Sequence, residues 1–187
     1  MDRQIRRYIR AKQKLIKLLE EQKQAIIHRA VTRGLDPNVR LKPSGVEWLG
    51  EVPEHWESVA LKWISKRYAG GTPDKSNETY WDDGDIPWLN SGAVNDEYIT
   101  EPSSFITKEG FAKSSAKWIP EKALVMALAG QGKTKGMVAQ LGIKTTCNQS
   151  MAAIIPASII EPRFLYWWLL NRQLNIFITP HRRSWDA

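Results

Sequence analysis

The sequence predicts an α+β protein in which one long helix of coiled-coil type is followed by one mixed α/β domain with an irregular, mostly antiparallel sheet. Three observations lead to this prediction. Residues 2–33 are rich in strong helix formers and contain neither Pro nor Gly. Residues 58–187 alternate short β-like runs with Gly- and Pro-containing turn signals. A connector rich in Pro, Gly and charge, residues 35–57, separates these two parts.

Residues 1–34 form the predicted helix with its C-terminal cap, and this helix has one apolar face. Gly34 is a suitable cap, and Pro37 prevents any continuation. A helix of about 30 residues is roughly 45 Å long and cannot bury an apolar seam by itself. No later segment offers a comparable seam, so we expect a helix of another chain, with a second copy of this chain as one candidate. The seam residues recur at helical spacing: Ile5, Tyr8, Leu15, Leu19 and Ile26.

The domain of residues 58–187 contains strand-like and helix-like segments. The helical candidates are residues 107–116 and 161–178, the second with Pro162 in its first turn. No internal repeat is evident, and the domain lacks the repeated strand–helix alternation that surrounds a nucleotide-binding loop. The predicted strands are residues 59–64, 86–90, 124–128, 137–141 and 152–155.

Composition indicates a folded protein of a reducing compartment. Of the 187 residues, 42% are hydrophobic and 25% are charged, which is typical of globular domains. The single cysteine, Cys147, has no partner for an internal disulfide, and no secretory signal opens the sequence. The apolar stretch 150–170 is interrupted by Pro156 and Glu161 and cannot span a bilayer. We therefore expect a cytoplasmic protein with no membrane partner.

The net charge of +7 is unevenly distributed. Residues 1–40 hold 11 Lys and Arg against 4 Asp and Glu, whereas residues 41–187 hold 16 of each. Within the second part, residues 74–101 are acidic and residues 108–144 are basic. This asymmetry favours a polyanionic partner bound in a defined orientation, and a solvated charged surface is the alternative.

The sequence argues against catalysis. Residues 127–134 resemble a nucleotide-binding loop with Lys133 in the phosphate position, but Ala127 replaces the leading Gly and a strand-like run follows instead of a helix. The three histidines are far apart, so no zinc spacing is present. No nucleophile–base pair is evident. We expect a binding protein with no catalytic residue, no metal and no cofactor of its own, and a small NTPase is the enzymatic alternative.

Two long stretches and several short ones resemble a known family. Residues 26–37 and 41–56 are similar to the conserved spacer helix of type I restriction–modification specificity subunits, together with the start of their target recognition domain. Shorter matches lie at residues 70–73, 80–81, 86–89, 114–117 and 147–150. The resemblance covers most of residues 20–170.

The resemblance implies a DNA-reading role within a larger complex. Specificity subunits of this family carry two recognition domains, each reading half of a split target in double-stranded DNA, spaced by paired helices. Modification subunits supply S-adenosylmethionine-dependent adenine methylation, and a restriction subunit supplies ATP-driven translocation and magnesium-dependent cleavage. This sequence has one helix and one domain, so we expect a half-subunit, a truncated product or a fragment. The alternative is a stand-alone or remnant DNA-binding or assembly module that recruits no methyltransferase.

We expect the basic section 108–144 to face DNA, because Lys side chains neutralise phosphates and Gln can pair with an adenine edge. The loop 131–135 is the leading candidate, with weaker ones in the turn after residue 70 and after the strand at 86–90. The candidate DNA-binding residues are Thr72, Lys75, Asn90, Ser91, Lys113, Lys117, Gln131, Lys133 and Lys135.

Overall fold

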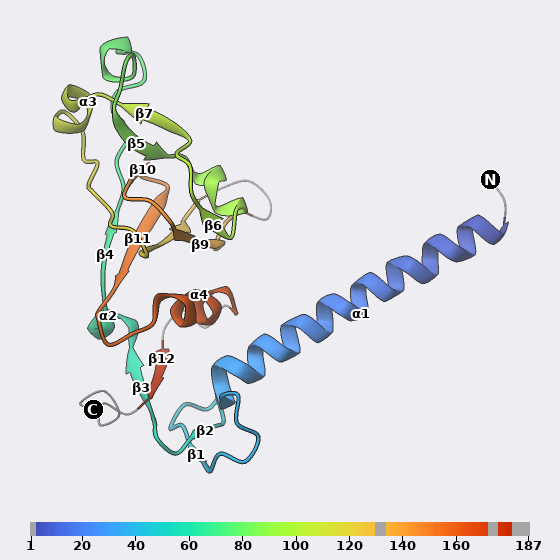
Figure 1. The fold of residues 1–187 in the computed structure, drawn as a ribbon. Helices are drawn as coiled ribbons and strands as arrows, with labels where there is room; N and C mark the ends of the chain where they lie inside the picture. The colour runs from blue at the N-terminus through green and yellow to red at the C-terminus, as the bar shows by residue number, and fades with distance from the viewer. Residues whose placement is uncertain (1–2, 130–133, 172–175, 181–187) are drawn as a thin grey trace. The chain divides into compact units, whose positions relative to one another are not determined.

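The structure is a computed structural model that describes residues 3–129, 134–171 and 176–180, with the backbone alone for the last range. The chain divides into two compact units, Met1–Ser58 and Val59–Ala187 (Figure 1).

The first unit consists of α1 (Arg3–Arg33) and a small antiparallel ribbon of β1 (Leu41–Pro43) and β2 (Glu51–Pro53). The predicted helix is therefore confirmed. Gly34 has φ +76° and donates its N–H to the carbonyl of Ala30 at 3.1 Å, which is a left-handed C-cap. Within α1 only Val31 and Thr32 are buried, so the rest of the helix, including the whole apolar seam, is exposed or half-buried.

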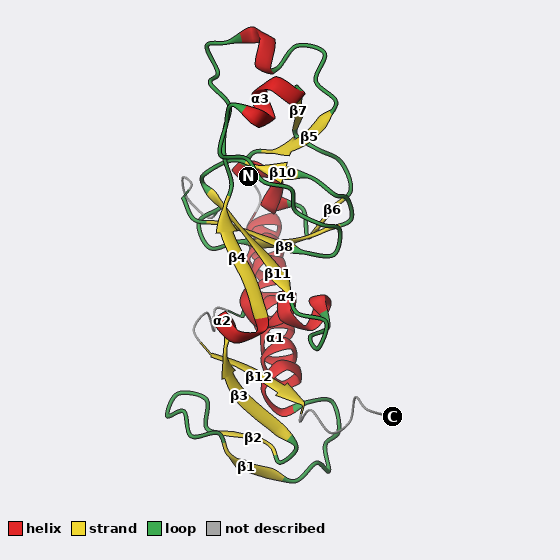
Figure 2. Ribbon diagram, turned by 90° about the vertical axis from the view of Figure 1, so that its left-hand side faces the viewer, coloured by secondary structure: helices red, strands yellow, loops and turns green. Residues whose placement is uncertain are grey.

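A five-stranded sheet is the centre of the second unit. Its pairs β4–β11, β11–β8 and β8–β9 are antiparallel and β9–β6 is parallel, which confirms a mostly antiparallel sheet. Figure 2 shows β4 and β11 running side by side. In spatial order the strands are β4 (Ser65–Ala69), β11 (Met151–Pro156), β8 (Leu124–Ala127), β9 (Val138–Leu141) and β6 (Tyr98–Ile99).

A second, three-stranded sheet lies further along the same unit. Its central strand β5 (Ile86–Leu89) pairs in parallel with β10 (Thr146–Cys147) and antiparallel with β7 (Ser104–Ile106). The larger core cluster, which includes Leu141 and Met151, joins the two sheets because it also contains Leu89 and Cys147. A smaller cluster of Ile86, Trp88, Ile106 and Ala116 packs under the second sheet. The two sheets therefore share the larger cluster, and the second sheet also has a smaller cluster of its own.

The remaining elements are short. Thr107 caps α3 (Lys108–Ala112), since its hydroxyl accepts the N–H of Gly110. The longest helix of the unit, α4 (Pro162–Leu170), buries Leu165, Tyr166, Trp168 and Leu169. The others are β3 (Trp56–Ala60), α2 (Leu61–Ile64), η1 (Glu78–Tyr80), η2 (Ser91–Asn95) and β12 (Ile176–Pro180).

Three predicted elements are wrong in part, the first being the helix predicted at residues 107–116, which ends at Ala112. The predicted strand 59–64 ends at Ala60, and residues 61–64 form the turn α2, because Leu61 and Ile64 are both buried at helical rather than alternating spacing. The predicted helix 161–178 ends at Leu170 with Asn171 as its C-cap. Residues 176–180 are a strand, in keeping with the β-branched and aromatic side chains there. Among the helices that the structure describes, none has the length and apolar character needed to cross a membrane.

Candidate nucleic-acid interface

Four segments that are far apart in the sequence meet where the two sheets join. The N–H of Gly71 donates to the carbonyl of Cys147 at 2.8 Å, and the N–H of Gly70 donates to that of Met151 at 3.0 Å. The indole N–H of Trp88 donates to the carbonyl of Gly71 at 3.0 Å. These bonds fix the turn after β4 against both sheets. We call this region the junction, defined as Gly70–Pro73, Trp88–Leu89, Ser115–Ala116 and Cys147–Gln149.

The junction is packed so closely that two of its positions admit only glycine. A Cβ atom on Gly70 would lie 2.2 Å from the carbonyl oxygen of Cys147. A Cβ atom on Gly71 would lie 2.3 Å from the backbone nitrogen of Ala116. Both distances are far below van der Waals contact, and backbone atoms cannot move aside as a flexible side chain can. The two glycines are therefore required for close approach of the backbone.

Polar side chains line the junction. The hydroxyl of Thr72 donates to Oε1 of the exposed Gln149. The N–H of Asn148 donates to the carbonyl of Leu89 at 2.9 Å, so this turn is also tied to the second sheet. Among the described residues, no donor reaches the buried Oδ1 of Asn148. The hydrogen bond from Thr72 therefore holds the exposed amide of Gln149 in place. The sequence pattern does not single out Gln149, although it lies in the short matching segment 147–150.

The loop between β8 and β9 starts beside the junction. The N–H of Leu128 donates to the carbonyl of Ser150 at 2.8 Å, and that of Gly136 donates to Ala127 at 2.8 Å. Two of the leading candidates, Gln131 and Lys133, lie outside the described residues. Lys135 is described and exposed. The base of the loop is therefore held by backbone hydrogen bonds to the segment that contains Gln149.

The candidates in the turn after β4 and after β5 differ in exposure and in the hydrogen bonds of their side chains. Lys75 is exposed in a turn where Ser76 donates from both N–H and Oγ to the Asp74 carboxylate, which lowers the pKa of Asp74. Asn90 is exposed, but its Oδ1 accepts the N–H of Gly92 at 2.8 Å and so caps η2. Ser91 is the half-buried first residue of η2. Only Thr72 among these four residues contacts the 147–150 turn through its side chain.

A cluster of basic and aromatic side chains lies on the surface next to the junction. Nζ of Lys117 lies 5.6 Å from the ring centroid of Tyr68, and Nζ of Lys144 lies 4.5 Å from that of Trp118. The hydroxyl of Tyr68 donates to the carbonyl of Trp118 at 2.5 Å, and burial raises the pKa of Tyr68. We call Tyr68, Lys117, Trp118 and Lys144 the aromatic–lysine cluster. Lys113 is exposed at the end of α3, outside this cluster.

The aromatic–lysine cluster holds its two cations in place. A Lys above an aromatic ring at an exposed site gains about 0.5–1 kcal/mol, which restricts the ammonium without removing it from water. Ammonium groups kept at fixed positions lose less entropy when they bind a phosphate than freely mobile ones. Lys144 had not been selected from the sequence, and its contact with Trp118 spans 26 positions, so no local pattern could have indicated it.

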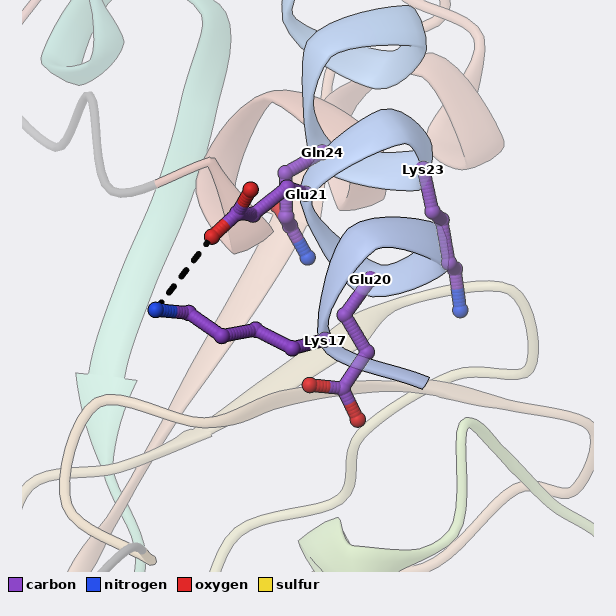
Figure 3. A pocket seen from close by; sticks show the side chains of 5 residues that line it. All are labelled: Lys17, Glu20, Glu21, Lys23 and Gln24. Carbon is purple, nitrogen blue, oxygen red and sulfur yellow. Dashed lines mark ion pairs between the residues drawn. The ribbon is translucent and has the colours of Figure 1, made fainter. Parts of the chain in front are cut away.

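The described residues contain no group of three or more His, Cys, Asp or Glu side chains that could hold a metal ion. The acidic residues after η1 form a turn in which Asp83 has φ +55° and Asp85 pairs with Lys108 at 3.9 Å. A hollow on α1 is lined by side chains of that one helix and is open to solvent (Figure 3). These features are structural or solvated.

The domain that contains the junction matches a known protein family. Residues 53–184 match the family model described as the type I restriction modification DNA specificity domain. The chain belongs to this family. The matched specificity domain contains the junction, the β8–β9 loop and the aromatic–lysine cluster. The resemblance stated from the sequence is thus confirmed for the larger part of the chain.

Two curated relatives of the chain are named as specificity subunits of type I restriction enzymes. The chain is 29% identical to the type I restriction enzyme EcoR124I/EcoR124II specificity subunit of Escherichia coli over 144 residues, covering 75% of this chain and 33% of the relative. It is 28% identical to the HindI specificity subunit of Haemophilus influenzae over 128 residues, covering 68% of this chain and 27% of the relative. The chain therefore spans about a third of the length of these curated relatives or less.

Solved structures share the fold at low sequence identity. An HsdS subunit from Thermoanaerobacter tengcongensis superposes with a TM-score of 0.59 and 16% identity, over 97% of this chain and 43% of that one. A chain from a study of complex assembly in a type I restriction–modification system gives a TM-score of 0.52 and 14% identity, over 95% of this chain and 46% of that one. These values confirm the predicted fold of a long helix followed by a mixed sheet domain.

Proposed function

We propose that this chain recognises a DNA sequence as a specificity subunit, or as part of one, of a type I restriction–modification complex. The observation that supports this most strongly is the match of residues 53–184 to the DNA specificity domain. The junction, the loop that begins at Leu128 and the aromatic–lysine cluster supply polar and cationic groups on one domain, as a DNA-reading surface requires.

The proposed mechanism divides the contacts into two kinds. Lys117 and Lys144, positioned by their aromatic neighbours, bind phosphates and set the register of the domain on the duplex. Gln149, held by the Thr72 hydroxyl, and the loop residues Gln131, Lys133 and Lys135 approach base edges. An amide side chain can both accept and donate, which suits the N6 and N7 positions of adenine in the major groove.

We propose that the chain itself performs no catalysis and acts in the cytoplasm. Modification subunits would bind S-adenosylmethionine and methylate adenine, and a restriction subunit would use ATP and magnesium for cleavage. The exposed seam of α1 would pair with a helix of a partner, and a second copy of the chain is the simplest case. With two-fold symmetry, such a pair would read an inverted repeat.

Selection from random duplexes tests the proposal as a whole. We expect the chain, purified with its modification subunits, to enrich one short motif, with affinity at least a thousandfold above that for unrelated duplex. Enrichment of no motif would contradict sequence reading. Binding of a motif by the chain, combined with no co-purification of a modification subunit, would favour the stand-alone or remnant module instead.

The aromatic–lysine cluster gives a residue-level prediction. The double variant Lys117→Ala/Lys144→Ala should weaken binding to every duplex by a similar factor and lower the slope of log affinity against log salt by about 2, because each phosphate contact contributes about 0.9. Lys62→Ala/Lys66→Ala removes the same charge from exposed positions of α2 and β4 and is the control. Equal salt slopes for the two variants, measured by fluorescence anisotropy, would show that the cluster does not contact DNA.

A further inference from the structure

Between Arg3 and Lys17, one face of α1 carries six cations and no acid. Arg3, Arg6, Arg7, Arg10, Lys14 and Lys17 are all exposed, and the first acidic residues of the helix are Glu20 and Glu21. At 3.6 residues per turn these six side chains lie within an arc of about 100°, roughly opposite the apolar seam. Figure 1 shows α1 as one uninterrupted helix along this whole length. We call these six residues the cationic ridge.

The cationic ridge has almost no counter-charge within its own unit. Its single salt bridge among the described residues joins Lys17 to Glu21 at 3.7 Å, at the end of the ridge (Figure 3). Both side chains of that pair are exposed, so the pair contributes little. In Figure 3 the side chain of Lys23 points away from this pair, so it does not extend the ridge. The six charges are therefore available to a ligand.

The arrangement is unfavourable for the helix alone. Like charges three or four residues apart destabilise a helix, and the ridge contains several such pairs, among them Arg3 with Arg7 and Arg6 with Arg10. Pairing of the seam does not require them, because the seam lies on the other side. A polyanion bound along the ridge would attract each of these cations and so offset the repulsion between them.

We propose that the cationic ridge binds the phosphate backbone of duplex DNA without regard to sequence. The inference rests on the proposed function and adds a second contact surface to it. Residues 41–187 have equal numbers of acidic and basic residues, so the excess charge that attracts DNA over a distance is on residues 1–40. Four of the six ridge cations are Arg, whose planar guanidinium matches phosphate oxygens.

The dimensions of the ridge also suit DNA. From Arg3 to Lys17 the helix rises about 21 Å, a distance over which duplex DNA presents about twelve phosphates. The seam and the ridge face opposite sides, so a partner helix and DNA can bind α1 at the same time. This surface would hold the chain on unrelated DNA, while the specificity domain distinguishes sequences.

A charge-matched pair of variants of the full chain tests the inference. The ridge variant is Arg6→Gln/Arg10→Gln/Lys14→Gln/Lys17→Gln. The control, Lys12→Gln/Lys23→Gln/Arg29→Gln/Arg33→Gln, removes the same charge from exposed positions of α1 off the ridge. For a duplex without the selected motif, we expect the ridge variant to bind at least tenfold more weakly in 50 mM salt. Its salt slope should fall by about 3, and the control slope should change by less than 1.

Each outcome of this experiment has a distinct meaning. Equal losses of DNA affinity and of salt slope in the two variants would overturn the proposal, because the change in net charge alone would explain them. Unchanged DNA binding together with weaker capture of a modification subunit would also overturn it and assign the ridge to an acidic protein. The ratio of motif to non-motif affinity should stay within twofold of the unsubstituted chain. If the unsubstituted chain shows no such preference, the proposed function fails while the ridge remains measurable. Helix content by circular dichroism controls for folding of α1.

Discussion

Gly71→Val should unfold the unit of residues 59–187 or destabilise it by at least about 3 kcal/mol, because its Cβ would lie 2.3 Å from the backbone nitrogen of Ala116. The same Cβ would also lie 2.4 Å from the carbonyl carbon of Ser115 and 2.5 Å from its Oγ. Relief of these contacts requires the turn after β4 to move, which breaks its hydrogen bonds to Cys147 and Trp88. The second sheet would then separate from the first.

The alkylation rate of the buried Cys147 thiol measures whether the two sheets have separated. Its side chain is fully buried and burial raises its pKa to about 12, so the native chain should react very slowly with iodoacetamide at neutral pH, where the thiolate is required. Gly71→Val should raise the alkylation rate and lower the urea midpoint. Gly92→Ala is the control, since a Cβ there meets only the Asn90 side chain, at 3.0 Å. A native midpoint with slow alkylation in Gly71→Val would show that the junction tolerates a side chain.

Leu15→Asp/Leu19→Asp should abolish association through α1. Both leucines are about half exposed in the single chain, at 48% and 54%, so they can bury more area only against another helix. Burial of the exposed half of each leucine contributes about 0.8–1.5 kcal/mol, so the loss of four leucines from a symmetric pair should weaken self-association at least a hundredfold. Sedimentation equilibrium measures self-association, and co-purification measures capture of modification subunits.

A matched variant distinguishes the effect of removing seam leucines from the effect of adding negative charge. Gln13→Asp/Gln24→Asp adds the same two negative charges to exposed positions of α1 outside the seam, and it should associate as the unsubstituted chain does. If Leu15→Asp/Leu19→Asp sediments and captures partners as this control does, the seam does not pair helices. The ratio of motif to non-motif affinity should be unchanged in either variant, since the specificity domain has its own core.

Local patterns predicted much of the fold. The 31 residues of α1 follow a helical period, and the end at Gly34 depends on one residue type. The strands β5, β8, β9 and β11 lie within the predicted ranges or extend them by a residue. The stretch Leu61–Ile64 was wrongly predicted as a strand, because a short apolar run fits a strand and a buried helical turn equally well. The prediction of one helix over residues 161–178 extended across the mostly polar residues 171–175 and so missed the strand β12.

The candidate site could be predicted only in part. Thr72 was chosen because it lies in a Gly-rich turn, but its partner Gln149 is 77 positions away. Contacts over such distances depend on strand order, which the sequence pattern does not specify. Lys117 was found from its charge, yet the ring of Tyr68 that positions it is 49 positions away. Gly70 and Gly71 were recognised as turn residues, although the structure requires them because backbone segments pass so close to them.

The way the β8–β9 loop is attached has a consequence for how such a domain can change its target. The loop is closed at its base by the bonds from Gly136 to Ala127 and from Leu128 to Ser150, and the strands on both sides are fully buried. Substitutions, insertions and deletions between these closing bonds leave the register of β8 and β9 intact. If the loop contacts DNA as we propose, new target sequences can arise by variation within this segment, while the glycines of the junction stay fixed and the stability of the domain is preserved.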